Sequence, residues 1–208
     1  MKVSFPALPT TCTDEKEPLP DPTVMLLAPL PASSRKELND ERLAGEMKLV
    51  SNWLLLRLYV TGIDVSTVAL ERAAQLAAAA GQDVANRITW QQADILTWDP
   101  APRQFDLVSA QFMHLPRSAR EVVYRRLAAA VRPHGSLLIV GHHPSDLKTT
   151  MRRPNLPDLF FTAEQVAAGL DPDGWQVVVA ASPERQTLDG EGRPVTISDA
   201  VMHAIRRK

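Results

Sequence analysis

The sequence predicts an α/β fold, a doubly wound and mostly parallel sheet whose last strand is antiparallel. Short apolar runs typical of buried strands alternate with stretches in which apolar residues recur every three or four positions, as on one face of a helix. The last two strand-like runs have no helix between them, which favours an antiparallel pair at the end. The chain has 208 residues, 45% hydrophobic and 23% charged, so one domain with an ordinary core is expected.

Residues 1–34 differ in composition from the rest of the chain. Seven of the 17 prolines lie in the first 31 residues, whereas the first glycine is Gly45. The short apolar run 24–30 stands alone, and the segment shows neither a helical nor a strand period. Such a composition buries too little apolar surface to offset the entropy of ordering. The sequence therefore predicts a disordered, proline-rich arm over 1–34 and a folded domain over 35–208.

The elements of this domain follow from local signals. Ser66 is a good N-cap, Gly81 a helix stop, and Thr162 with Gln165 a capping box. Helices are expected over 36–58, 66–81, 118–131 and 163–170. Strands are expected over 58–63, 87–91, 105–110, 137–140, 175–180 and 200–205, with a helix-breaking turn at 132–135.

Charge and cysteine content exclude several function classes. The net charge of −1 provides no field that favours nucleic acid or an anionic membrane. Cys12 is the only cysteine, so no internal disulfide and no cysteine metal cluster can form, which favours a reducing, cytoplasmic location. The longest apolar stretch, 49–60, is far shorter than the ~20 residues of a membrane span. A small-molecule partner is expected.

Candidate site residues follow the strands, because ligands of such sheets bind beyond the carboxyl ends of the strands. Asp64 ends one strand, where a carboxylate can accept two hydrogen bonds from a ribose diol. Asp94 follows the next strand, where it can accept a bond from an adenine amino group or serve as an ordinary turn acid. Gln111 and Phe112 follow the strand that begins near Asp106, and Asp106 itself is expected to stabilise that strand start.

Together these pieces resemble the class I S-adenosylmethionine-dependent methyltransferases over about residues 55–208. The matching segments are Val60-Thr61-Gly62-Ile63-Asp64-Val65-Ser66, Gln92-Ala93-Asp94-Ile95, Phe105-Asp106-Leu107-Val108 and 127–140. The resemblance implies a seven-stranded sheet and S-adenosylmethionine as cofactor. It implies that Asp64 holds the ribose, that Val65 packs on adenine, and that Asp94 and Ile95 complete the adenine pocket. Gly62, Gln111 and Phe112 would line the same site.

The sequence departs from the family at its glycine-rich loop, which should lie about twenty residues before Asp64. The candidate, Leu43-Ala44-Gly45-Glu46-Met47, keeps one glycine, so the first strand is expected to be remodelled or lost. Three functions stay open: methyl transfer to a small molecule, a catalytically impaired methyltransferase-like binding protein, and a nicotinamide-dependent oxidoreductase. The last is weakest, since neither Tyr59 nor Tyr124 has Lys at the fourth following position, as one common reductase pattern requires.

Methyl transfer requires mainly alignment of the reactants, with a general base only for weakly acidic acceptors. His142 and His143 are the candidates for that base, although adjacent residues of an extended segment point to opposite faces. One is therefore expected to be packed and one exposed, and no metal site is predicted because no third ligand is evident. His114 is a further candidate for lining the site. The arginines at 117, 120, 125 and 126 are expected to form a solvated helix face.

Overall fold

The structure is a computed structural model that describes residues 23–27, 59–113 and 115–208. Its strands are β1 Thr23–Leu27, β2 Val60–Asp64, β3 Ile88–Gln92, β4 Phe105–Gln111, β5 Val131–His142, β6 Trp175–Ala181, β7 Glu184–Leu188 and β8 Pro194–Arg206. Its helices are α2 Thr67–Ala80, α3 Gln82–Ala85, α4 Arg117–Ala130 and α5 Ala163–Ala167, with 3-10 turns η3 Pro144–Lys148 and η4 Pro157–Leu159. The helix expected over 36–58, the loop around Gly45, and His114 lie outside the described residues.

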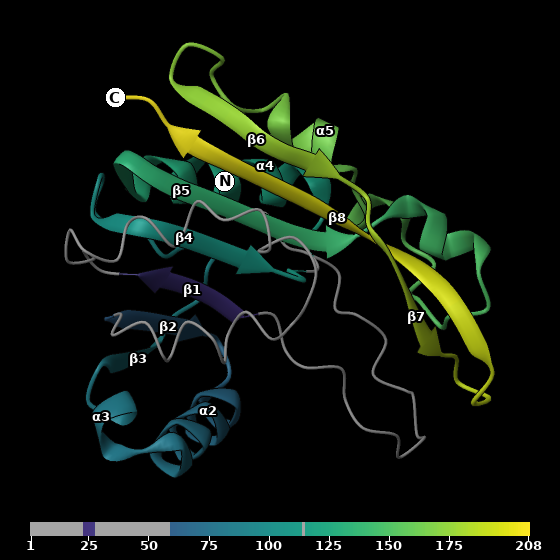
Figure 1. The fold of residues 1–208 in the computed structure, drawn as a ribbon, viewed down its shortest axis with the longest axis horizontal. Coiled ribbons are helices and arrows are strands. Elements are labelled where there is room, and N and C mark those ends of the chain that lie inside the picture. The colour runs from purple at the N-terminus through teal and green to yellow at the C-terminus, as the bar shows by residue number, and fades with distance from the viewer. Residues whose placement is uncertain (1–22, 28–58, 114) are drawn as a thin grey trace, which may run out of the picture.

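The strands form one mixed sheet of eight, in the order β3-β2-β1-β4-β5-β8-β6, with β7 paired to β8 (Figure 1). β2 is parallel to β3 and β4 to β5, while β8 is antiparallel to both β5 and β6. The prediction of an α/β fold with an antiparallel last strand is confirmed. The prediction of a mostly parallel sheet is wrong for the strand pairings, because only β2–β3 and β4–β5 pair in parallel among the described residues. The described residues contain eight strands rather than the expected seven, because β7 is added, and β1 is antiparallel to both of its neighbours.

β1 is the main departure from the expected topology. It lies between β2 and β4 and is antiparallel to both, with Val24 opposite Ile63 on one side and Ala110 on the other. The prediction of disorder is therefore wrong for Thr23–Leu27. Without a strand in this place, β2 and β4 would each have an unpaired edge of backbone donors and acceptors. The five-residue run gains its order from these distant partners, which its own composition does not reveal.

β7 was also missed, although the sequence contains a signal for it. Asp189-Gly190 lies between β7 and β8, and Asp-Gly is a strong hairpin-turn dipeptide. Asp189 Oδ1 accepts hydrogen bonds from the backbone N–H groups of Glu191 and Arg193. These bonds, that of Arg193 above all, lower the pKa of Asp189. The hairpin extends β8 past β6 and lies near η3, at the carboxyl end of β5 (Figure 1).

Several local predictions are confirmed. Ser66 Oγ accepts a hydrogen bond from the N–H of Ala69, and Gly81 ends α2 with a φ of 129°. Thr162 and Gln165 form the full capping box, but α5 ends at Ala167 and is shorter than expected. The expected turn at 132–135 is instead the irregular first part of β5, in which His134 has a φ of 64°. Arg132 pairs there with Asp106, which confirms that Asp106 stabilises the start of β4.

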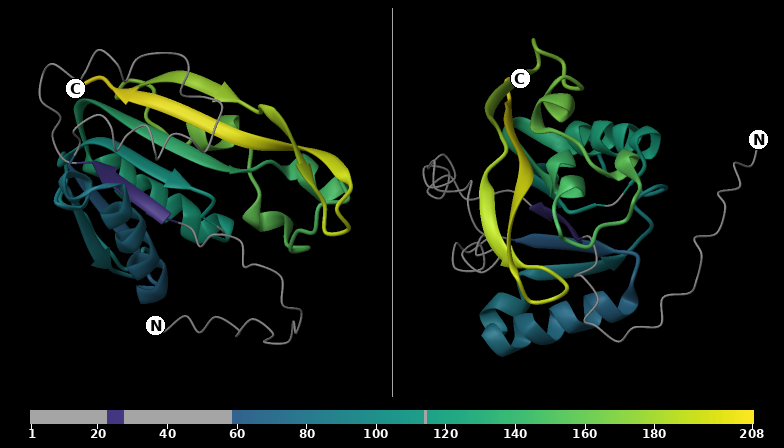
Figure 2. Two further views of the ribbon diagram at one scale, coloured as in Figure 1. Left: turned by 60° about the horizontal axis from the view of Figure 1, so that its bottom comes forward. Right: turned by 90° about the vertical axis from the view of Figure 1, so that its right-hand side faces the viewer.

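α4 and α5 lie on one face of the sheet, whereas α2 packs against β2 and β3 (Figure 2). The inward face of α4 carries Arg120, Val123, Tyr124 and Leu127, all of them buried. The prediction of a solvated arginine face is wrong for Arg120, whose guanidinium donates to the carbonyls of Leu115 and Asp158 and lies over the Phe161 ring. Burial lowers its pKa. The helical spacing of apolar residues places Arg120 on the inward face of α4, but a charged side chain is not expected to be buried there.

Gly141 provides a test of the core beneath this face. A Cβ built on Gly141 would lie 2.3 Å from a ring carbon of Phe161, a contact that the buried strand and ring cannot relieve without moving. Gly141→Ala is therefore expected to lower the free energy of unfolding by about 1–3 kcal/mol, the usual effect of overpacking. Urea denaturation measures it. Gly169→Ala, whose Cβ would meet only one atom at 3.3 Å, is the control and should change stability far less. Equal effects of the two substitutions would contradict this packing.

Candidate functional site

The carboxyl ends of β2, β4 and β5 lie at one edge of the sheet. β4 and β5 are parallel, and β2 runs the same way because both β2 and β4 are antiparallel to β1. This edge therefore carries Asp64 from β2, Gln111 from β4 and His142 from β5. Three strand spacings, or ~14 Å, separate β2 from β5, so an elongated small molecule can span them.

Asp64 is the best-defined candidate at this edge. Its residue is only 4% exposed, and its Oδ1 accepts a hydrogen bond of 2.8 Å from the N–H of Ser66. Its Oδ2 is buried and has no hydrogen-bond partner among the described residues. An unsatisfied buried acceptor typically costs ~1–3 kcal/mol, so its presence calls for an explanation. A ligand hydroxyl would satisfy this oxygen, which is the arrangement that a ribose diol requires.

Some of the residues around Asp64 are packed against the core, and others are exposed to solvent. Gly62 lies against Trp90, whose ring is 2.4 Å from where a Cβ would stand, so close packing explains this glycine. Val65 is 65% exposed and offers an apolar surface beside Asp64. Asp94 Oδ1 accepts a hydrogen bond from the N–H of Leu96. This carboxylate therefore orders the turn after β3, as expected of an ordinary turn acid. Ile95 is partly buried against the core.

Gln111 ends β4, and Phe112 follows it. The Gln111 side chain donates to Ser109 Oγ, whereas the N–H of Phe112 donates to the carbonyl of Val140 on β5. Phe112 has a φ of 51°, in the left-handed region that bulky residues rarely adopt. Such conformations cost about 1–3 kcal/mol and cluster at ligand sites. The Phe112 ring lies 4.9 Å from the His142 ring, centroid to centroid, and so joins the ends of β4 and β5.

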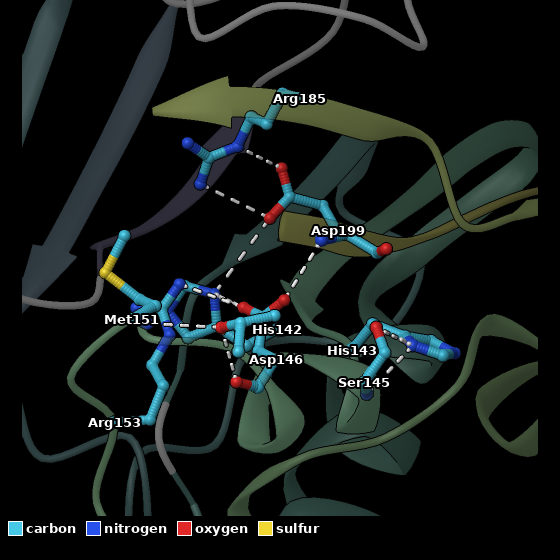
Figure 3. A network of polar contacts seen from close by, with 10 residues as sticks. His142, His143, Ser145, Asp146, Met151, Arg153, Arg185 and Asp199 are labelled. Carbon is cyan, nitrogen blue, oxygen red and sulfur yellow. Dashed lines mark hydrogen bonds and ion pairs between the residues drawn. The ribbon is translucent and has the colours of Figure 1, made fainter. Parts of the chain in front are cut away.

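Of the two candidate histidines, His142 is packed as predicted, whereas His143 is half-buried rather than exposed. His142 is 9% exposed, and its Nδ1 lies 4.0 Å from Oδ2 of Asp146 and 4.0 Å from Oδ1 of Asp199 (Figure 3). His143 is half-buried and caps η3, where its Nδ1 accepts from the N–H of Ser145. His142 thus belongs to the site edge, and His143 has a local structural role.

Charged residues that were not predicted from the sequence surround His142. Asp146 is fully buried and accepts hydrogen bonds from Arg153 and from the N–H of Ser198. Asp199 accepts a 2.7 Å bond from Arg185 of β7. We call His142, Asp146, Asp199, Arg153 and Arg185 the His142 cluster. Asp199 could have been predicted from the sequence, because an acidic residue within the apolar run of β8 must be buried and paired. No sequence pattern marks Asp146, Arg153 or Arg185.

The candidate residues therefore form two groups on either side of β1. Asp64, Val65, Asp94 and Ile95 lie at β2 and β3, whereas Gln111, Phe112 and His142 lie at β4 and β5. Among the described residues, no group of three His, Cys, Asp or Glu side chains is arranged to hold a metal ion. Nor is any described helix long and apolar enough to cross a membrane.

The family comparison agrees with this arrangement. Residues 48–135 match a family model described as a methyltransferase domain. The resemblance to the class I S-adenosylmethionine-dependent methyltransferases is confirmed. The methyltransferase match spans β2 to the start of β5 and so contains Asp64, Asp94 and Phe112. Among curated proteins, no match to the sequence is found.

Three solved structures illustrate the methyltransferase fold. An N-methyltransferase, NodS from Bradyrhizobium japonicum, superposes with a TM-score of 0.51 at 16% identity, over 71% of this chain and 73% of its own. A SAM-dependent methyltransferase from Methanosarcina mazei gives 0.52 at 14% identity, over 71% and 81%. A structure concerned with the conversion of a disulfide bond into a thioacetal group in echinomycin biosynthesis gives 0.52 at 16% identity, over 71% of this chain and 66% of its own.

At these identities the superpositions show the fold alone. The methyltransferase family match supports methyl transfer as the general activity, with S-adenosylmethionine as the cofactor.

Proposed function

We propose that this protein binds S-adenosylmethionine at the β2 end of the site edge and transfers its methyl group to a small-molecule acceptor at the β4 and β5 end. The observation that carries the proposal is Oδ2 of Asp64, a buried acceptor with no partner among the described residues, at the strand end where the family binds ribose. The exposed Val65 beside it provides an apolar surface for adenine. The near-neutral net charge favours a small-molecule acceptor over nucleic acid.

The bound cofactor supplies a methyl group that is already electrophilic, so the chain's own residues have mainly to bind and align. Asp64 would hold the ribose, Asp94 and Ile95 would border the adenine, and Gln111 and Phe112 would lie where the acceptor approaches. Phe112 and the buried His142 ring would exclude water from this end of the site.

Calorimetry with S-adenosylmethionine, S-adenosylhomocysteine and NAD on the same sample tests the cofactor. We expect both adenosyl ligands to bind and NAD not to. The dissociation constant should lie in the high-micromolar range or above, because Gly45 is the only glycine left in the loop segment of the sequence. Binding of NAD alone would support the oxidoreductase alternative instead. The cytoplasmic location stays a prediction from the single cysteine.

A second candidate, a methyltransferase-like binding protein without turnover, is favoured by one observation. Because β1 is reversed, its first residue, Thr23, lies opposite Gln111 at the site edge, and its last, Leu27, lies at the other edge. The carboxyl end of β1 therefore lies at the edge of the sheet away from the candidate site. Binding of S-adenosylhomocysteine without methyl transfer to any acceptor would support this candidate.

A further inference from the structure

We infer that the cavity between α4 and α5 binds a small aromatic carboxylate, at a site separate from the one proposed for methyl transfer. The cavity has a volume of about 630 Å³, within the ~300–1,000 Å³ that is usual for ligand pockets. The residues that line it come mainly from α4, α5, the start of β6 and the end of β8. The inference does not depend on the proposed function.

The charges along the cavity favour an anion. Five basic side chains line it, against two acidic ones, Glu121 and Asp171, although the whole chain has a net charge of −1. Asp171 also has a local role, because its Oδ1 accepts a hydrogen bond from the N–H of Asp173. The local excess of cations therefore attracts an anionic ligand that the protein as a whole would not.

Arg125 is the cation without a partner on the cavity side of α4. Arg117, Glu121 and Arg125 all line the cavity, and their spacing of four residues places them on one face of the helix. Glu121 pairs with Arg117 at 2.9 Å. Arg125 is exposed and makes no ion pair or hydrogen bond among the described residues. Its guanidinium is therefore available to a carboxylate, which it can bind through two parallel N–H donors.

Arg206 supplies a second guanidinium, which the protein already holds in place. Its Nη1 donates to the carbonyls of Ala128, Ala129 and Val131, at 3.3, 3.3 and 2.7 Å. Its Nε and Nη2 donate to no group in the part of the chain that the structure describes. Because this side chain is already ordered, binding an anion beside it costs little further conformational entropy.

Apolar side chains from α5 and β6 provide surface for a ring. Val166 of α5 and Leu170, which follows that helix, are half-buried, and Trp175 begins β6. The guanidinium carbon of Arg206 lies 5.9 Å from the centre of the Trp175 ring. Cationic and apolar surfaces therefore meet at this end of the cavity. An aromatic ring that carries a carboxylate matches both surfaces.

This end of the cavity lies away from the candidate site. Trp175 is paired with Arg206 in the sheet. β8 is antiparallel to β5, so Arg206, the last residue of β8, lies beside the first part of β5. His142, at the other end of β5, is paired with Asp199 instead. A ligand between Arg206 and Trp175 would therefore occupy the opposite edge of the sheet from the proposed cofactor.

Calorimetry with three probes tests the site: 2-naphthoate, its neutral analogue 2-naphthamide, and acetate. We expect saturable binding of 2-naphthoate with a dissociation constant below about 1 mM. 2-Naphthamide, which lacks the charge, should bind at least about tenfold more weakly. Acetate, which lacks the ring, should show no measurable binding.

Arg125→Gln should weaken binding of 2-naphthoate about threefold to tenfold, as expected for loss of an exposed ion pair. Its Tm should be unchanged, because Arg125 has no partner among the described residues to lose. Arg72→Gln is the matched control. It removes another exposed arginine without a described partner, from α2 at the other end of the sheet, and should bind 2-naphthoate as the native protein does.

NMR signals of the indole N–H groups locate the bound ring. Trp175 lines the cavity, whereas Trp90 and Trp98 do not. On titration with 2-naphthoate, the Trp175 signal, assigned with Trp175→Phe, should therefore shift, and the signals of Trp90 and Trp98 should not. Saturating S-adenosylhomocysteine should not displace 2-naphthoate.

Four outcomes would overturn the inference: no saturable binding of 2-naphthoate, equal affinity for 2-naphthamide, equal affinity of Arg125→Gln and the native protein, or displacement by S-adenosylhomocysteine. Failure of S-adenosylhomocysteine itself to bind would instead overturn the proposed function and leave this second site standing.

Discussion

Replacing Met25 by proline is expected to lower the free energy of unfolding by about 3 kcal/mol or more. Met25 is the middle residue of β1, opposite Gly62 of β2 and Ser109 of β4. A central strand uses its backbone N–H groups in ladders on both sides, and proline has no N–H and fits only edge strands. For a domain of this size the loss corresponds to roughly 6–12 °C in Tm.

Thermal and urea denaturation of the full chain measure this effect. Removal of residues 1–20, which the sequence predicts to be disordered and which precede β1, is the control and should leave Tm nearly unchanged. An unchanged Tm in Met25→Pro would show that the sheet does not depend on β1. Residues 1–34 would then be the dispensable arm that their composition predicts.

Asp64→Ala is expected to weaken binding of S-adenosylhomocysteine by at least about tenfold. Hydrogen bonds to a charged group typically contribute ~1.5–3 kcal/mol each, and ~1.4 kcal/mol is a factor of ten in affinity. Oδ2 is the oxygen placed to accept from a ligand, since Oδ1 already accepts from Ser66. Without ligand, Tm should change little, because the substitution removes an unsatisfied buried acceptor together with one hydrogen bond.

Calorimetry on the variant gives the affinity directly. Asp83→Ala removes the same charge from an exposed position on α3 and should bind as the native protein does. Equal affinity of Asp64→Ala and the native protein would remove Asp64 from the site. A large fall in Tm without ligand would show instead that Asp64 mainly stabilises the turn to α2.

The sequence by itself determined the features that depend on neighbouring residues. Ser66, Gly81 and the pair Thr162–Gln165 mark helix ends through contacts within a few residues, and the structure confirms each of them. The runs that form β2, β4 and β8 are recognisable because their burial follows from their own apolar composition. The order of these elements was enough to predict the α/β class and to place Asp64 at a strand end.

Only the tertiary structure decided the features that depend on distant partners. Thr23–Leu27 is a strand because β2 and β4 pair with it on both sides, over separations of more than thirty residues. The His142 cluster draws its charges from β5, η3, β7, β8 and the segment after η3, so no local pattern could have assembled it. Arg120 is buried because carbonyls and a ring from elsewhere in the chain surround its guanidinium. Burial of a charge and pairing of a strand are settled by the partners that folding brings together, and those partners are not adjacent in the sequence.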